Sequence, residues 1–171
     1  QAVVSLEDVT LTNGPGRGIA LGFGVKASLC DIVATDVWTD AVDISGGGSQ
    51  VDVAGLAATG QLGTTGIAIY TNDPFTDSGD VQFSLHDAVL GTGDVEIRVR
   101  GGSDISLVRV VMEDNHFNLT APNSEVRVED SVIRFGLADM QHNHFIRPGR
   151  VRFSNSDLYL SESFGKVRTR E

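Results

Sequence analysis

A repeating sequence pattern constrains the fold of this chain more than any other feature. Gly18-Ile-Ala-Leu21 returns almost unchanged as Gly66-Ile-Ala-Ile69. Related copies begin at Ala41, Asp94, His116 and, in degraded form, Asp139. Successive copies start 23, 25, 28, 22 and 23 residues apart. A fixed period in this range is typical of architectures in which each unit buries its apolar face against the next one.

A second pattern is in phase with the first. It reads Val4-Ser-Leu-Glu-Asp8-Val-Thr-Leu11 in the first unit, and later copies begin at Ala27, Val51, Val81 (with an extra residue), Ile105, Val126 and Val151. Apolar and polar residues alternate, as in strands with one buried face. The alternation slips by one residue at Asp8, Asp31, Gly55, Arg109, Asp130 and Asn155. We expect a bend there, because Asp, Asn and Gly tolerate the left-handed backbone conformation, with Arg109 as the exception.

Each unit therefore holds three short strands and no stretch long enough for a helix. The pattern predicts an all-β parallel solenoid of about seven turns, each of roughly 24 residues with three short strands, forming a single domain over residues 1–171. Equivalent positions would stack about 4.8 Å apart. The predicted core columns are Leu6, Leu29, Val53, Phe83, Leu107, Val128 and Phe153, and beside them Ile19, Val42, Ile67, Val95 and Phe117.

The unit resembles the right-handed parallel β-helix of the pectate-lyase-like superfamily, over roughly residues 3 to 160. This resemblance implies a right-handed solenoid. It does not choose among polysaccharide lyases, hydrolases, tailspike depolymerases and non-enzymatic adhesins, because one fold hosts many functions. The Asn-Thr-Asp and Gly-Asp-Asp runs that resemble a polygalacturonase are absent from the sequence. No catalytic residue is therefore carried over from the superfamily.

Composition excludes several classes of partner. The net charge of −10 argues against a nucleic-acid partner, because phosphate contacts require Lys and Arg. The single cysteine, Cys30, excludes an intramolecular disulfide and a multi-cysteine zinc site. No run of 18 apolar residues is present, so we expect no membrane insertion.

The best candidate site lies on the outward face of the Gly18–Leu21 type of strand. The early copies place Gly and Ala outside, whereas the later copies place charged and polar residues there. Candidates for acid, base or anion-neutralising chemistry are Asp94, Glu96, Arg98, His116 and Asp139, and candidates for substrate binding are Asn118, Gln141 and Asn143. The alternative is that these are ordinary solvated residues on an exposed sheet face.

The longest side loop, residues 70–80, carries several oxygen ligands. Asp73, Asp77 and Asp80 are candidates for calcium binding, although their spacing matches neither an EF-hand nor a nonapeptide calcium repeat. The alternative is a solvated loop in which these carboxylates cap local backbone groups. We expect no other cofactor.

Neither end of the sequence shows an amphipathic helix or a polar cap. Since bare strand edges favour association, we expect either a segment of a longer rod or a unit that associates with itself, end to end or as a trimer. We predict a non-catalytic module, extracellular or on a cell or virion surface, with a structural, adhesive or assembly-forming role. The alternatives are a polysaccharide lyase or hydrolase acting on an acidic glycan at the outward face of the central strands, and a phage spike segment.

Overall fold

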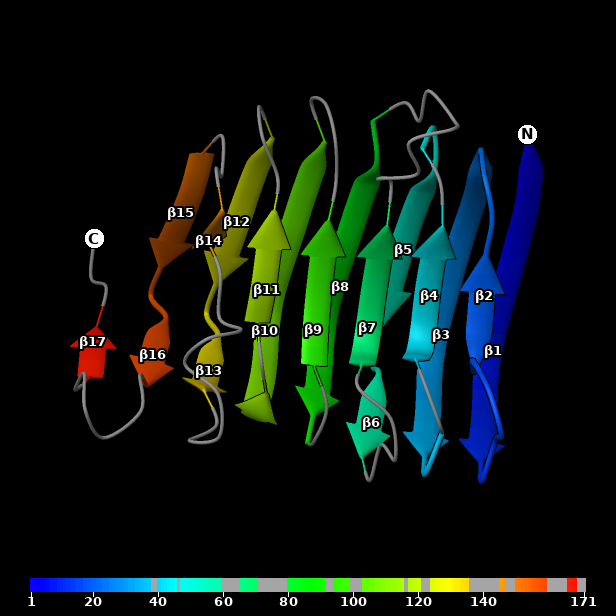
Figure 1. Cartoon of the computed structure of the whole chain (residues 1–171), viewed down its shortest axis with the longest axis horizontal. Coiled ribbons are helices and arrows are strands. Elements are labelled where there is room, and N and C mark those ends of the chain that lie inside the picture. Colours follow the sequence, from blue (N-terminus) through cyan, green and yellow to red (C-terminus); the bar gives the residue numbers. More distant parts are fainter. Residues whose placement is uncertain are drawn as a thin grey trace.

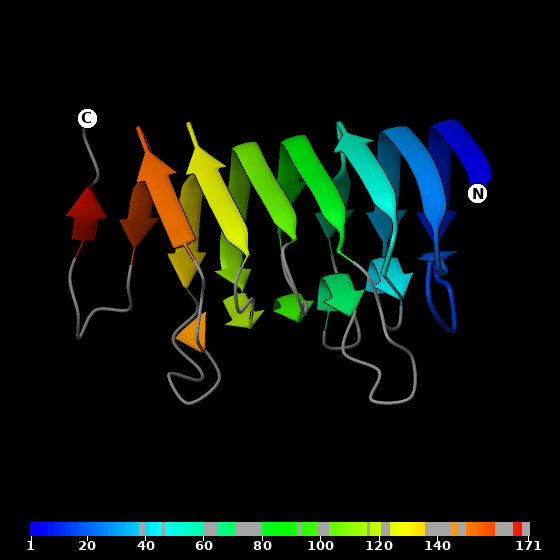
Figure 2. The same ribbon diagram turned by 90° about the horizontal axis from the view of Figure 1, so that it is seen from above.

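The chain folds as a parallel β-solenoid in which two sheets run along the long axis of the molecule (Figure 1). The computed structural model describes residues 1–37, 40–45, 47–59, 65–70, 80–91, 94–98, 103–115, 117–120, 124–135, 145–146, 150–159 and 166–168. These residues contain strands and no helix. Strand β1 lies at one end of the solenoid and strand β17 at the other, as the view from above also shows (Figure 2).

Sheet 1 contains eleven strands: β1 (Ala2–Thr12), β3 (Val25–Thr35), β5 (Gln50–Ala54), β6 (Ala57–Thr59), β8 (Gln82–Leu90), β10 (Asp104–Asn115), β12 (Glu125–Glu129), β13 (Val132–Phe135), β15 (Arg150–Ser154), β16 (Asp157–Tyr159) and β17 (Lys166–Arg168). Sheet 2 contains six: β2 (Ile19–Leu21), β4 (Asp40–Ser45), β7 (Thr65–Tyr70), β9 (Asp94–Arg98), β11 (Phe117–Thr120) and β14 (Phe145–Ile146). Among the described strands, every pairing is parallel except that of β16 with β17.

Equivalent positions of successive units lie side by side, as the repeat predicts. The second predicted column, Ile19, Val42, Ile67, Val95 and Phe117, is paired in full. The first column differs at one position, because Leu85 and not Phe83 continues from Val53 to Leu107. Phe83 instead pairs with Val51 and Ile105. The unit predicted to begin at Val81 therefore has no extra residue. Its copy of the pattern begins at Phe83, which lies four residues before the bend residue Asp87, just as Val4 lies four residues before Asp8.

The predicted bends are confirmed. All bend residues have positive φ angles between 44° and 67°: Asp8, Asp31, Gly55, Asp87, Arg109, Asp130 and Asn155. We call this set the bend column. The residues before each bend form the first arm of a unit and those after it form the second arm. Left-handed backbone at each bend lets both arms turn their apolar side chains inward.

The prediction of three separate strands per turn is not borne out. In β1, β3, β8 and β10 the two arms form one continuous bent strand. The arms are separate only as β5 and β6, β12 and β13, and β15 and β16. In the later units, serine hydroxyls accept hydrogen bonds from backbone N–H groups after the bend. Val110 N donates to Ser131 Oγ at 3.0 Å, and Ser131 N donates to Ser156 Oγ at 3.2 Å. The number of turns stays a prediction.

The core fills the space between the sheets. Leu29, Val53, Leu85, Leu107 and Val128 are all buried. The residues of β1 that face the same core, Val4, Leu6, Val9 and Leu11, are only partly buried, because β1 pairs with β3 on one side alone among the described strands. The opposite end differs from our expectation of two bare ends, since β17 covers the edge of β16 in antiparallel pairing.

Candidate functional site

The outward face of sheet 2 was the predicted site, and the structure describes part of it through the backbone of β9 and β11. Glu96 pairs with Ala68 on one side and Asn118 on the other. Arg98 pairs with Tyr70 and Thr120. The predicted stacking of Glu96 with Asn118 is therefore correct. Whether these side chains perform chemistry stays a prediction.

Two registers on this face differ from the prediction. Asp94 pairs with Thr65 and not Gly66, because the pairing of β7 with β9 shifts by one residue at this point. Strand β11 pairs with β14, which places Leu119 beside Phe145, so the copy predicted to begin at Asp139 is not the neighbour of β11. Phe145 and Ile146 are both apolar, whereas the predicted copy would have required His142 at a core position. His116, Asp139, Gln141 and Asn143 lie outside the described residues.

The predicted calcium loop is described only at its end. Asp73 and Asp77 lie outside the described residues. Asp80 is exposed, and its carbonyl oxygen accepts a hydrogen bond from Gly48 N at 2.9 Å. Within the described part of the chain, no three His, Cys, Asp or Glu side chains come together as a metal site would require.

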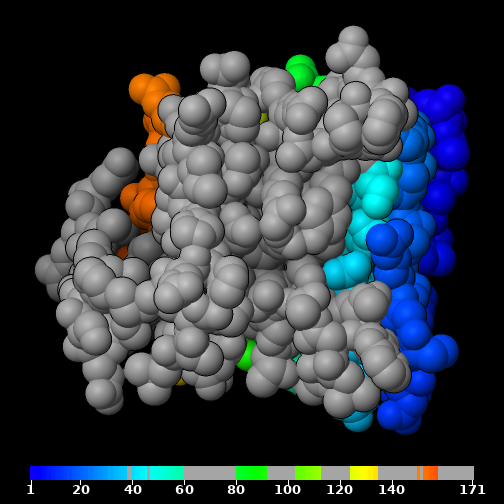
Figure 3. All heavy atoms as spheres, viewed as in Figure 1, coloured from blue at the N-terminus to red at the C-terminus, as the bar shows by residue number. Residues whose placement is uncertain are grey.

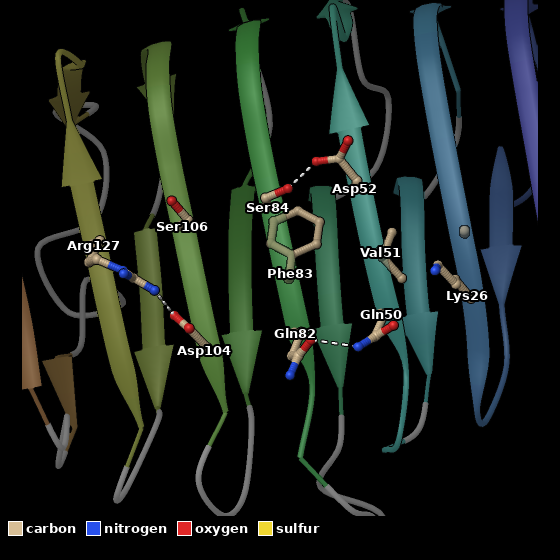
Figure 4. Close-up of a pocket in the computed structure, with 11 residues that line it drawn as sticks. Lys26, Gln50, Val51, Asp52, Gln82, Phe83, Ser84, Asp104, Ser106 and Arg127 are labelled. Atoms are coloured by element: carbon tan, nitrogen blue, oxygen red, sulfur yellow. Dashed lines mark hydrogen bonds and ion pairs between the residues drawn. The ribbon is translucent and has the colours of Figure 1, made fainter.

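The structure instead reveals a shallow groove of about 410 Å³ on the outer surface of the first arms, which we call the first-arm groove (Figure 4). Strands β3, β5, β8, β10 and β12 each contribute outward side chains to it. Its polar lining consists of Lys26, Gln50, Asp52, Gln82, Ser84, Asp104, Ser106 and Arg127. Alternation along each strand places these residues outside while their neighbours enter the core.

The side chains of the first-arm groove bind one another across neighbouring strands. Gln50 Nε2 donates to Gln82 Oε1 at 2.7 Å, and Arg127 Nη2 donates to Asp104 Oδ1 at 2.5 Å. The ion pair with Asp104 raises the pKa of Arg127 above its usual value. These cross-strand pairs line one face of the sheet with amide, hydroxyl and charged groups, about 4.8 Å apart along the solenoid.

One cluster in this region contains the residue types of a catalytic triad but not its geometry. Ser84 Oγ donates to Asp52 Oδ1, and His86 Nε2 lies 3.4 Å from the same oxygen. In a triad the hydroxyl must be hydrogen-bonded to the imidazole that takes its proton. Here both Ser84 and His86 bind Asp52, so the hydroxyl has no base.

The bend column contains a bidentate ion pair between Arg109 and Asp87. Arg109 forms two hydrogen bonds to Asp87, from Nε to Oδ1 at 2.6 Å and from Nη2 to Oδ2 at 2.7 Å. The Arg109 guanidinium holds the pKa of Asp87 well below its usual range, and His86 lowers it further. Both side chains are about half exposed, so solvent screens the pair and its role is to hold neighbouring bends together.

Cys30 does not have the surroundings of a nucleophile. It lies beside Asp31, and a hydrogen bond from Cys30 Sγ to Asp31 Oδ2 raises the pKa of the thiol. Glu7 and Asp8 add to this effect. Reactive cysteines require the opposite, a positive environment that stabilises the thiolate.

A buried carboxylate lies on sheet 2 close to the N-terminal end. Asp43 is fully buried, and Ser45 Oγ donates to its Oδ1 at 2.9 Å. Arg17 Nη1 lies 2.8 Å from Asp43 Oδ2, and Arg17 Nε lies 3.7 Å from Asp40 Oδ2. The Arg17 contact has the distance of an ion pair without hydrogen-bond alignment. A buried charge requires such a partner, so we assign Arg17 a structural role.

Our sequence reasoning missed the first-arm groove, although its signal was present. The outward positions of the first arms read Lys26, Gln50, Gln82 and Asp104 in successive units, and they are as rich in polar groups as the Gly18–Leu21 type of strand. What the sequence did not show is the pairing of these side chains in space.

Comparison with known proteins adds no family assignment. No protein-family model matches the sequence, and no curated protein matches it. The class of protein is therefore defined by the fold alone, an all-β parallel solenoid. Among the described residues, no helix is long and apolar enough to cross a membrane.

Proposed function

We propose that the chain is a non-catalytic β-solenoid module with an assembly-forming, structural or adhesive role, extracellular or on a cell or virion surface. The observation that carries this proposal is the edge of β1 that pairs with no described strand. This strand is eleven residues long, and the side chains that it turns toward the core are only partly buried. Val3 is 77% exposed at the same edge. Exposed edges of long strands are templates for association.

The partner at this edge is either a further turn of a longer chain or a second copy. Sedimentation velocity over a range of concentrations tests self-association. We expect species larger than the monomer as concentration rises, because each added copy buries the open end of the core. A monodisperse monomer at all concentrations would overturn self-association.

The alternative function is recognition of a polysaccharide at the first-arm groove. The repeated amide and hydroxyl groups of Gln50, Gln82, Ser84 and Ser106 favour it, since they present hydrogen-bond donors and acceptors at regular intervals along the solenoid. Incubation with a panel of anionic polysaccharides in the presence of calcium separates binding from catalysis. Binding without product supports recognition alone, and product formation supports a lyase or hydrolase. If neither binding nor product is found, both alternatives are contradicted.

We infer further that the solenoid is right-handed, has about seven turns and is related to the pectate-lyase-like superfamily. Continuous parallel pairing from β1 through β3, β5, β8 and β10 to β12 and β15 supports the turn number. Parallel strands joined by crossovers within one sheet are right-handed in nearly all proteins. An experimental structure at a resolution that shows side chains would decide all three points.

A further inference from the structure

The two ends of the first-arm stack carry opposite charges. Strand β1, at one end, contains two acidic residues, Glu7 and Asp8, and no basic residue. Strand β15, at the other end, contains Arg150 and Arg152 and no acidic residue. All four side chains lie at exposed positions. The blue atoms of β1 form the outer end of the molecule in Figure 3. Complementary ends of this kind favour head-to-tail contact over contact between two like ends.

We propose that copies of this chain associate head to tail, with β1 of one copy adding in parallel to β15 of the next copy, at the edge of β15 that pairs with no described strand. This inference rests on the proposed assembly function and gives it a direction and an interface. Continuing the register of the first arms places Val3 of the second copy beside Arg150, and Leu6 of the second copy beside Phe153. Leu6 and Phe153 are both core residues that are only partly buried in the single chain. Their contact would close both open ends of the core.

A contact within the chain shows that Arg152 and Glu7 of the second copy would lie close enough to form an ion pair. Asp52 and His86 lie on neighbouring strands, two positions apart along the strand direction, and approach to 3.4 Å. Arg152 and Glu7 of the second copy would have the same relative positions. Arg152 is 56% exposed and 3.6 Å from Glu125, so a second carboxylate on its other side is accessible.

The bend column would continue across the same contact. Asn155 Nδ2 already donates to Asp130 Oδ1 of the preceding unit at 2.6 Å. Asp8 of the second copy would be the next member of this column, on the opposite side of Asn155. Both residues already have the left-handed conformation that the column requires.

Strand β17 limits this association. It pairs with β16 through Leu158 and Val167, so it occupies the edge at which the second arm of an incoming β1 would add. With β17 in place, the first arm of the incoming β1 can pair with β15 only if its second arm stands away from β16, so the contact is restricted to the first arm and is weak. A heterologous contact of this type grows into a filament unless it is capped. We therefore assign β17 the role of a cap that weakens growth at this end.

Cysteine crosslinking tests the direction of association. In a Cys30→Ser background, we combine Val3→Cys with Arg150→Cys, which leaves Glu7 and Arg152 intact. Neighbouring positions on parallel strands are about 4.8 Å apart, within the range that a disulfide spans. Under oxidising conditions the double variant should give a ladder of crosslinked oligomers on a non-reducing gel. Each single variant should give dimers at most, because it has one cysteine.

Charge reversal and deletion test the contacts and the cap. Glu7→Arg and Arg152→Glu should each shorten the ladder, and their combination should restore it, because the pair is re-formed with opposite polarity. Deletion of residues 160–171 should lengthen the ladder. If sedimentation shows association but the double variant gives only crosslinked dimers, the head-to-tail arrangement is overturned. The proposed assembly function then still stands. No association of any variant, the deletion included, would overturn self-association altogether, and the head-to-tail arrangement with it.

Discussion

At the scale of single residues, the bend column determines how the chain turns. Six of its positions could be predicted from sequence, because the slip in alternation falls on residue types that tolerate a left-handed backbone. Arg109, the exception in the sequence, has a φ of 53°, and its hydrogen bonds to Asp87 show why a long basic side chain is useful at this position. The pairings within the column could not be predicted, because they depend on which side chains lean toward which neighbour.

Gly55 is the bend residue with the strictest requirement. Its φ is 67°, and a Cβ at this position would lie 2.5 Å from Asp31 Oδ1. We expect Gly55→Ala to lower the free energy of unfolding by about 1–3 kcal/mol, through left-handed strain and displacement of Asp31. Gly55→Asn should cost less, since Asn tolerates this conformation and can bind Asp31 as Asn155 binds Asp130.

Chemical denaturation of the two Gly55 variants measures these differences. Gly22→Ala is the matched control, because a Cβ there meets no atom within 4 Å. If Gly55→Ala is as stable as the Gly22 variant, then the left-handed bend is not required at this position.

The ion pair between Asp87 and Arg109 should make stability depend on pH in a defined direction. The pKa of Asp87 is lowered in the folded chain, so the pair contributes its full stability above the ordinary pKa of aspartate and loses it progressively as the pH falls from there toward the lowered pKa of the folded chain. Asp87→Asn should therefore lower the melting temperature at pH 7, and its difference from the parent chain should shrink progressively as the pH falls below the ordinary pKa of aspartate. Asp8→Asn makes the same change at a bend position of β1 that does not contact Arg109, and a thermal melt series of both variants gives the comparison.

At the scale of elements, the bent strand is the unit from which the solenoid is built. Its two alternating arms were evident in the sequence, but their fusion into one strand was not, because alternation alone does not show whether pairing continues through a bend. The later units separate the arms, and there Ser131 and Ser156 supply hydroxyl oxygens inside the bend. These buried serines look unremarkable in the sequence, since a small polar residue beside a turn is common.

Position along the solenoid should set the cost of removing a core side chain. Leu6 and Leu29 pair with each other in the same column, but Leu29 is 1% exposed and has strands on both sides, whereas Leu6 is only partly buried. We expect Leu29→Ala to destabilise the fold by about 2–5 kcal/mol and Leu6→Ala by clearly less. Ser28→Ala, an exposed neighbour, should be within about 0.5 kcal/mol of the parent chain. Equal losses at Leu6 and Leu29 would mean that the end of the core is covered in solution.

At the scale of the whole molecule, charge is distributed unevenly along the solenoid. Residues 1–85 contain ten acidic and two basic residues, whereas residues 86–171 contain thirteen and eleven. Contact between two N-terminal ends is therefore opposed by like charges, and contact between unlike ends is the less repulsive arrangement. This asymmetry and the repeat could be predicted from the sequence alone. The end at which the strand edge is covered could not, because β17 follows no copy of the repeat.

Hydrogen exchange should report both the stacking and the proposed direction of assembly. In dilute solution the amides of β5 and β8, which pair on both sides, should be protected most strongly, and those of β1 should exchange faster because one side of the strand is free. At a concentration at which sedimentation shows association, protection should rise in β1 and β15 together and stay unchanged in β5. Protection that rises at β1 alone would indicate contact between two N-terminal ends. Protection that rises in neither strand would place the contact on another surface of the solenoid.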